Sequence, residues 1–266
     1  MHNLRESRKK VLARVASAKH IALFLDFDGV LSPITRDHRK ALIGARTKKL
    51  LVACAKQFFV AVISGRALKD VRRRVGIRGL SYGGNHGLEW KFNSKNFSVP
   101  VPTSNRRILD MILRDCRALS KQFLGLSLED KDLTISIHYR MVSPRFRKHA
   151  ITAISKVLDT YVKGGKLTVV GGHMLFNIRP NTRWDKGSVA LWMLKRLPKG
   201  TLPISLGDDV TDEALFRTLR NGVTIRVGHT KKSLARYNIF SRREVDSFLS
   251  SLFIAKQQNK VRNRVQ

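Results

Sequence analysis

Apolar residues recur along the first hundred positions with two alternating spacings. The largely apolar segments 21–27 and 58–63 have the length of buried strands, whereas the segments 44–56 and 67–75 carry apolar residues at helical spacing. A further short strand is expected at 79–82. Strand and helix therefore alternate, and this order predicts a parallel sheet covered by helices.

The pattern changes after VPVPTSN, whose two prolines interrupt local structure. The elements expected next are a helix at about 104–120, two alternating strands in LGLSLEDKDLTISIHYR, a helix from Pro144, a strand at 166–170 and a strand in HMLFNIRP. Together they predict a compact α+β domain at residues 103–179.

Alternation of strand and helix then resumes. The expected elements are a helix from Asp185 to Leu197, the strand LPISLGDD, a helix from Thr211, the strand GVTIRVG and a final helix at about 243–256. The tail AKQQNKVRNRVQ is polar and basic, and we expect it to be frayed. The predicted fold is α/β: a Rossmann-like core with a parallel sheet at 1–102 and 180–266, interrupted by the smaller α+β cap domain.

The first twenty residues have two possible interpretations. They could form an Arg-rich organellar transit peptide, but an amphipathic helix with Leu4, Val11, Leu12 and Val15 facing inward is favoured. They lack the continuous apolar centre of a secretion signal.

Charge is the unusual feature of the composition. The chain of 266 residues has 52 Lys and Arg against 19 Asp and Glu, a net charge of +33. Such a surface attracts phosphorylated metabolites, nucleic acid and anionic lipid alike, so charge by itself selects no partner. We expect incidental binding of polyanions.

Two cysteines and the hydropathy pattern bear on location. Cys54 and Cys116 lie in apolar or helical contexts, which indicates core thiols and a reducing compartment. No apolar run approaches the roughly 20 residues that cross a bilayer. We therefore expect a cytoplasmic monomer that acts on a small molecule without membrane contact.

Polar side chains gather where predicted strands end. Asp26 and Asp28 follow the first strand, Ser64 follows the second, and Asp208 and Asp209 follow LPISLG. The carboxyl ends of parallel strands share one sheet edge, where ligands bind. Clustered carboxylates repel one another, and a divalent cation such as Mg²⁺ would neutralise them together with an ammonium group. The remaining candidates are Asp212, one helical turn further on, and Lys186 at the start of a helix.

Several motifs resemble those of a known enzyme superfamily. DFDGV, VISGR, the KG that begins at Lys186 and LGDDVTDEALF are similar to the four motifs of the haloacid dehalogenase phosphotransferases. Together with GGNHGLE and HYR, their order resembles the trehalose-6-phosphate phosphatases over about residues 20–255. Position 30 is Val where that family usually has Thr, a change that should leave the chemistry intact.

The resemblance implies a mechanism. Asp26 would be the nucleophile that forms an aspartyl-phosphate, and Asp28 the acid and base, on a turn where Gly29 lets the backbone approach the phosphate. Ser64 and Lys186 would stabilise the phosphate, with Gly65 and Arg66 of the same SGR motif beside it. The residues implied for Mg²⁺ are Asp26, Asp28 through its main-chain carbonyl, Asp208, and Asp209 and Asp212 as metal contacts or as groups that orient water or Lys186.

The same resemblance assigns sugar or phosphate contacts to a further set of polar residues. These are Asn85, His86, Glu129, Lys131, His138, Arg140 and Asn177. The strand positions among them could equally form a solvated face, and His138 could be a structural histidine. Asn177 stands where the family usually has Glu, which puts the sugar preference in question.

The implied activity is hydrolysis of trehalose 6-phosphate to trehalose and phosphate. One alternative keeps the reaction and changes the substrate to sucrose phosphate, to mannosyl- or glucosyl-phosphoglycerate, or to another sugar phosphate. The other alternative is a basic nucleic-acid-binding protein on the same fold, suggested by the net charge and by the run Arg72 to Arg74.

Overall fold

The computed structural model describes residues 1–172, 174–230 and 232–265. The chain divides into two compact units. The larger unit consists of Met1–Thr35, Arg39–Ser98 and Trp184–Gln266. The smaller unit consists of Arg36–His38 and Val99–Arg183, and the predicted α+β domain at 103–179 falls within this second range.

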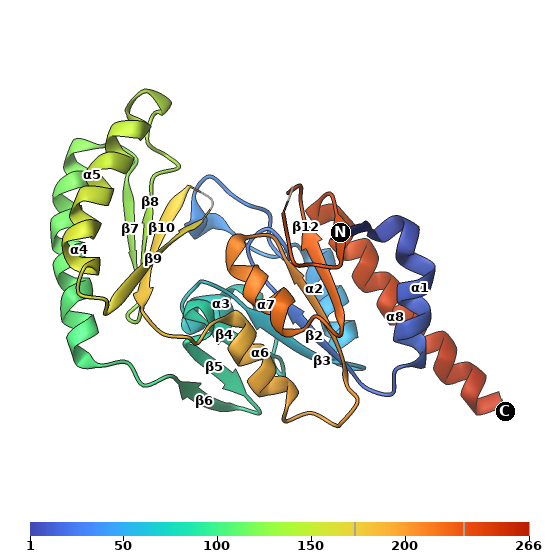
Figure 1. Cartoon of the computed structure of the whole chain (residues 1–266). Coiled ribbons are helices and arrows are strands. Elements are labelled where there is room, and N and C mark those ends of the chain that lie inside the picture. Colours follow the sequence, from blue (N-terminus) through green and yellow to red (C-terminus); the bar gives the residue numbers. More distant parts are fainter. Residues whose placement is uncertain (173, 231, 266) are drawn as a thin grey trace. The chain divides into compact units, whose positions relative to one another are not determined.

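A mixed sheet forms the centre of the larger unit (Figure 1). In the described part of the chain it has nine strands in the order β1-β13-β12-β11-β2-β3-β4-β5-β6. Their bounds are β1 His2–Asn3, β2 Ile21–Leu25, β3 Phe59–Ile63, β4 Ser81–Gly84, β5 Glu89–Phe92, β6 Lys95–Ser98, β11 Leu202–Gly207, β12 Val223–Val227 and β13 Tyr237–Ile239. All pairs from β1 to β4 in this order are parallel, so the predicted parallel core is confirmed.

Strand β2 is buried on both faces because every residue of IALFL is apolar. Leu23 and Leu25 join one apolar cluster with residues of the helices α1 Leu4–Ser17, α2 Ala45–Ala55, α3 Leu68–Val75 and α8 Arg242–Val265. Phe24 points the other way and contacts the ring of Phe59. The helices α6 Lys186–Leu194 and α7 Glu213–Thr218 pack against each other, and Figure 1 draws them on the opposite face of the sheet from α2.

The N-terminal helix is confirmed as part of the larger unit. Leu4, Val11 and Val15 are buried in the same cluster as the central strands, and Leu12 packs against it. Helix α1 lies against α8 (Figure 1). The two cysteines are free and buried, as expected, and burial raises the thiol pKa of Cys54 to about 12 and of Cys116 to about 11.

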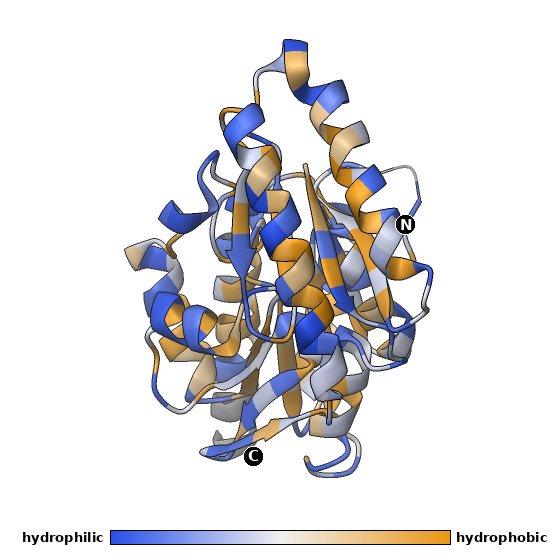
Figure 2. Cartoon of the chain, turned by 90° about the vertical axis from the view of Figure 1, so that its left-hand side faces the viewer, coloured by the Kyte–Doolittle hydropathy of each residue, from blue (hydrophilic) through white to orange (hydrophobic). Residues whose placement is uncertain are grey.

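The smaller unit is a layer of two helices on an antiparallel sheet. The strands run in the order β7-β8-β10-β9. The bounds are α4 Thr103–Gln122, β7 Ser127–Asp130, β8 Ile135–His138, α5 Pro144–Val162, β9 Leu167–Gly172 and β10 Leu175–Pro180. Ile135, Ile137 and Ile178 face the helices and form a separate core with residues such as Leu109 and Ile154. Helices α4 and α5, nearest the viewer in Figure 2, each show one hydrophobic and one hydrophilic side.

Three elements differ from the sequence prediction. The hairpin β5–β6 was not predicted; Asn93 and Ser94 turn the chain there with φ of 46° and 66°, which is the left-handed pair that a tight hairpin needs. The tail expected to be frayed continues α8 as far as Val265, because it contains helix-forming residues and neither Gly nor Pro. The helix predicted from Thr211 begins as a 3₁₀ turn, Val210–Asp212. In the predicted strand HMLFNIRP, His173 lies outside the described residues.

Candidate active site

Three buried carboxylates form the centre of the candidate site. Asp26 follows β2 and Asp208 follows β11, which are neighbouring parallel strands, and the Asp26 N–H donates to the Leu206 carbonyl at 3.0 Å. Asp212 comes from the 3₁₀ turn after β11. One ligand oxygen from each of these three aspartates lies within 4.8 Å of the other two. The fold therefore brings together the acidic residues that the strand ends predicted.

Lys186 supplies the counter-charge. Its Nζ lies 3.1 Å from Asp26 Oδ1 and 2.8 Å from Asp212 Oδ1, and the side chain is only 2% exposed. Burial by itself would lower the lysine pKa, but the charges and hydrogen bonds of Asp212 and Asp26 raise it above its usual value. Lys186 is the first residue of α6, and the Asp185 side chain caps that helix by accepting from the Ser188 N–H.

One lysine does not balance three carboxylates. Burial raises the pKa of Asp26 well above its usual range, and the charges of Asp212, Asp208 and Asp28 raise it further, while Lys186 opposes them. The group thus has an excess of negative charge and offers only oxygen atoms. This is the donor set that suits Mg²⁺, so Asp26 and Asp208 fit the metal site that the resemblance implied.

Asp212 also organises the backbone of the turn. Its Oδ2 accepts from the N–H groups of Asp208 and Asp209, each at 3.0 Å. The Asp209 carboxylate instead caps the turn by accepting from the Val210 N–H at 2.8 Å, and it does not belong to the group of three. A metal contact by Asp209 stays a prediction, and its observed contact is structural.

Two features of the structure require glycine at position 29. Its φ is +75°, and a Cβ at this position would overlap the carboxylate of Asp208. Only glycine meets both conditions. From the sequence, we expected Gly29 to let the backbone approach the phosphate. The structure shows a second reason for glycine: the Asp208 carboxylate occupies the space that a Cβ would need.

Asp28 lies in a different environment from Asp26. Its side chain is 42% exposed, and both carboxylate oxygens accept from Arg66: Oδ2 from Nε and Oδ1 from Nη2, each at 2.8 Å. Asp70, one turn into α3, accepts from Arg66 Nη1 at 3.1 Å. Arg66 therefore holds Asp28 in one orientation. The substrate contact that the resemblance implied for Arg66 stays a prediction.

The second strand end carries the hydroxyl expected to bind phosphate. Ser64 is buried, and its Oγ accepts from the Arg66 N–H at 3.2 Å. Gly65 lies against the imidazole of His86, which a Cβ would overlap. Asn85 is fully buried and donates from Nδ2 to Glu89 Oε1 at 2.7 Å. Asn85 and His86 thus support the loop that carries the SGR motif, and their sugar contacts stay predictions.

The smaller unit presents a polar face on its sheet. Glu129 on β7 and Asn177 on β10 both pair in register with Ser136 on β8. Lys131 Nζ donates to Ser136 Oγ, which donates to Asn177 Oδ1, both at 2.6 Å. Lys131 Nζ also lies 3.7 Å from Glu129 Oε2. These residues are buried or half-buried, which distinguishes them from a solvated face.

Two histidines complete this cluster. His138 Nε2 lies 3.1 Å from Glu129 Oε2, and the rings of His138 and His38 stack with centroids 3.9 Å apart. Burial would raise the pKa of Glu129, but Lys131 and the two histidines lower it well below its usual range. His38, Glu129 and His138 have spacing that could hold a metal ion, although Lys131 already compensates the carboxylate. Arg140 lies just beyond β8, where its carbonyl accepts from Arg147.

Comparison with known proteins identifies the family. The trehalose-phosphatase family model matches residues 24–246. The chain belongs to the trehalose-phosphatase family. It is 32% identical over 266 residues to the probable trehalose-phosphate phosphatase D of Arabidopsis thaliana, covering 93% of this chain and 71% of that protein. It is also 32% identical over 226 residues to a trehalose-phosphate phosphatase of Mycobacterium tuberculosis, covering 80% and 55% of the two chains.

A solved structure supports the fold of this phosphatase. The C-terminal domain of the C. albicans trehalose-6-phosphate phosphatase aligns with a TM-score of 0.82 at 21% identity, covering 92% of this chain and 96% of that one. The predicted relation to the trehalose-6-phosphate phosphatases and the predicted α/β fold are confirmed. No helix among the described residues combines the length and apolar content that a bilayer crossing requires.

Sequence reasoning missed four residues that the phosphatase uses to arrange its polar groups. Ser136 could have been found, because it alternates with Ile135 and Ile137 and so shares a face with His138. Asp70 lies four residues after Arg66, a spacing that could have suggested a pair. Glu89 ends the GGNHGLE motif, and its position four residues after Asn85 could have suggested that pair. His38 carried no signal, since its partners Glu129 and His138 are distant in the sequence.

Proposed function

We propose that this phosphatase hydrolyses trehalose 6-phosphate to trehalose and phosphate, with Mg²⁺ as cofactor. The observation that carries the proposal is the contact of Lys186 with both Asp26 and Asp212 beside Asp208, in a chain of the trehalose-phosphatase family. Mg²⁺, when bound by Asp26, Asp208 and the Asp28 carbonyl, would neutralise charge on the phosphoryl group.

The residues of the larger unit divide the reaction into two displacements. A carboxylate oxygen of Asp26 attacks phosphorus, the bond from phosphorus to the sugar oxygen breaks, and Asp28 donates a proton to that oxygen. Asp28 then takes a proton from water, which attacks the same phosphorus and frees Asp26. Lys186 and Ser64 stabilise the negative charge on the phosphoryl oxygens throughout.

We assign recognition of the sugar to the polar face of the smaller unit. Glu129 accepts hydrogen bonds, Lys131 donates them, and the amide of Asn177 can do both, which suits a disaccharide rich in hydroxyl groups. Asn177 replaces the family's usual Glu, and Ser136 binds its Oδ1 at 2.6 Å. This change favours testing other sugar phosphates beside trehalose 6-phosphate.

The deciding experiment measures phosphate release with Mg²⁺ from a panel of substrates: trehalose 6-phosphate, sucrose phosphate, and mannosyl- and glucosyl-phosphoglycerate. The proposal predicts that kcat/KM is highest for trehalose 6-phosphate by about tenfold or more. A higher kcat/KM for another sugar phosphate would overturn the substrate and leave the mechanism standing. No release from any of them would overturn the activity.

We also propose a cytoplasmic, monomeric enzyme. The free buried thiols of Cys54 and Cys116 agree with a reducing compartment. Size-exclusion chromatography with light scattering tests the monomer, and a concentration-independent mass of twice 30.2 kDa would contradict it.

A further inference from the structure

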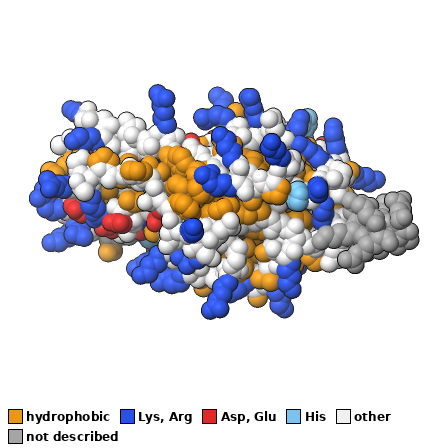
Figure 3. Space-filling model, turned by 90° about the horizontal axis from the view of Figure 1, so that it is seen from below, with side chains coloured by type: hydrophobic (Ala, Val, Ile, Leu, Met, Phe, Trp, Pro, Cys, Tyr) orange, Lys and Arg blue, Asp and Glu red, His pale blue; other side chains and the backbone are white. Residues whose placement is uncertain are grey.

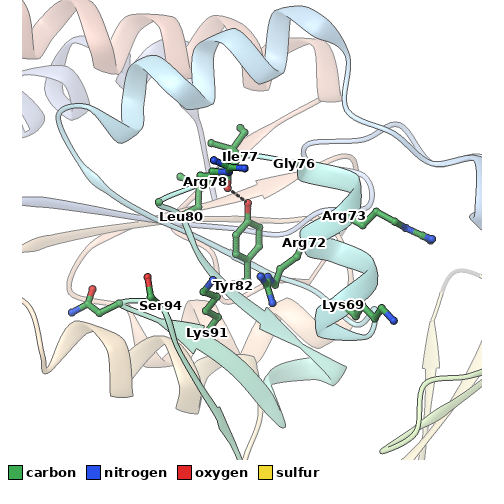
Figure 4. A pocket seen from close by; sticks show the side chains of 12 residues that line it. Lys69, Arg72, Arg73, Gly76, Ile77, Arg78, Leu80, Tyr82, Lys91 and Ser94 are labelled. Carbon is green, nitrogen blue, oxygen red and sulfur yellow. Dashed lines mark hydrogen bonds between the residues drawn. The ribbon is translucent and has the colours of Figure 1, made fainter.

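A basic pocket lies in the larger unit, apart from the carboxylate group. It has a volume of about 870 Å³ and lies between α3, β4 and the β5–β6 hairpin (Figure 4). Five cationic side chains line it, and none of its lining residues is acidic or belongs to the group around Asp26. The five are Lys69, Arg72, Arg73, Arg78 and Lys91.

The local structure explains why these charges gather. Lys69, Arg72 and Arg73 occupy positions i, i+3 and i+4 on α3, which places them on one side of the helix. Gly76 then ends α3 with φ of 60° and turns the chain towards Arg78. Lys91 enters from β5, where it is the register partner of Tyr82 on β4.

Tyr82 is the one aromatic residue among the described residues that line the pocket. Its ring is buried, and its hydroxyl donates to the Ile77 carbonyl at 2.7 Å (Figure 4). No lining aromatic ring is therefore exposed for stacking on a base. Asn93 and Ser94 add an amide and a hydroxyl at the hairpin. The pocket offers charge and hydrogen bonds but no aromatic platform.

The positive charge of the pocket is mostly uncompensated. Arg73 pairs with Asp70 at 2.7 Å. Lys69, Arg72, Arg78 and Lys91 form no ion pair with a described acidic residue. Arg72 and Lys91 are half-buried and the other three are exposed, whereas the fully buried cations Lys186 and Arg66 are paired with carboxylates. Four neighbouring cations repel one another, and an anion bound among them would relieve that repulsion.

We propose that this pocket binds a small ligand with several linked phosphate groups, either an inorganic oligophosphate or the triphosphate of a nucleotide. Arginine guanidinium groups bind phosphate oxygens in pairs, and the lysines add point charges. The pocket is large enough for more than one phosphate group. Because no aromatic ring among the described lining residues is exposed for stacking, the phosphates are the part of the ligand that the pocket would recognise. Arg72 and Arg73 of the basic run noted in the sequence line this pocket, whereas Arg74 pairs with Asp70 outside it.

The test is titration of tripolyphosphate into the full chain by calorimetry without divalent cations. The pocket variant combines Arg72→Gln, Arg78→Gln and Lys91→Gln. The matched control combines Lys195→Gln, Lys199→Gln and Arg220→Gln, which removes the same charge from exposed positions of the same unit. We expect one site per chain, binding at least about tenfold weaker in the pocket variant, and binding within about threefold of wild type in the control.

Three results would overturn the proposal: no saturable binding by the wild-type chain, equal weakening in both variants, or unchanged binding in the pocket variant. Circular dichroism and a kcat/KM within about twofold of wild type verify that the variants are folded, since the changed residues lie outside the catalytic group. Titrations with ATP and with adenosine show whether the bound phosphates belong to a nucleotide or to an inorganic chain. Tighter binding of ATP supports a nucleotide and equal binding an inorganic chain, whereas competition by adenosine would overturn recognition through phosphate.

Discussion

Asp26 and Asp28 are two residues apart, yet their environments suit opposite tasks. The Asp26 side chain is 6% exposed and lies beside Lys186, whereas that of Asp28 is 42% exposed and is held by Arg66. A fixed nucleophile needs little freedom, and an acid that also activates water needs access to solvent. Position placed both residues at the sheet edge and the resemblance implied their roles, but neither predicted the Arg66–Asp70 support, which depends on how α3 begins.

Arg66→Lys tests that support. Lysine keeps the charge but cannot hold both oxygens of Asp28, so we expect kcat to fall about tenfold to a hundredfold with a smaller change in KM. Arg73→Lys is the control, because Arg73 pairs with the same Asp70 from an exposed position and should matter little. Equal effects of the two changes on kcat would remove Arg66 from this role.

Gly29→Ala tests the packing beside Asp208. Strain at φ of +75° and displacement of the Asp208 carboxylate should lower the free energy of unfolding by about 2–3 kcal/mol and remove most activity. Gly200→Ala is matched in φ, at +77°, with open space around its Cβ, and should cost about 1 kcal/mol with activity retained. Urea unfolding and kcat/KM measure both, and similar losses in the two variants would refute the role of Asp208.

At the level of elements, the strands of the smaller unit show what an alternating pattern of apolar and polar residues can predict. The pattern predicted strands and the polar positions of Glu129 and His138. It could not predict that Lys131, Ser136 and Asn177 form a hydrogen-bonded row, because register between β7, β8 and β10 is set by tertiary pairing. The β5–β6 hairpin was missed for a local reason, since Asn-Ser is a weaker turn signal than Asn-Gly.

Asn177→Glu tests whether this row selects the sugar. The added carboxylate would lie near Ser136 and Lys131 and accept more hydrogen bonds, so we expect kcat/KM ratios between sugar phosphates to change by about tenfold. p-Nitrophenyl phosphate, which has no sugar, serves as the control substrate and should react at an unchanged rate. An equal change for every substrate would place the effect in stability or chemistry instead.

At the scale of the whole molecule, the net charge is the property that could least be interpreted from the sequence alone. Figure 3 shows Lys and Arg side chains spread over one face with few acidic ones among them. The structure separates two cases. Lys186 and Arg66 pair with carboxylates of the candidate site, whereas in the basic pocket every lining cation except Arg73 lacks an ion pair with a described acidic residue. Such a separation depends on three-dimensional neighbours, so the net charge of +33 could not have predicted it.

Binding of Mg²⁺ should be visible in the stability of the whole chain. The excess negative charge of the three carboxylates favours binding of the metal. A metal present at 100 times its Kd should stabilise the native state by about 2.7 kcal/mol and raise Tm. Asp208→Asn should abolish most of that rise, and a chelator should abolish phosphate release by the wild-type enzyme. Activity that persists in chelator, or a Tm rise retained in the variant, would contradict the metal site.

The nucleophile can be tested most directly with Asp26→Asn. Phosphate release from trehalose 6-phosphate with Mg²⁺ should fall by at least about a thousandfold, because an amide is a poor nucleophile, while circular dichroism shows an intact fold. Release within about tenfold of wild type by a folded Asp26→Asn enzyme would contradict the assignment of Asp26 and the mechanism built on it.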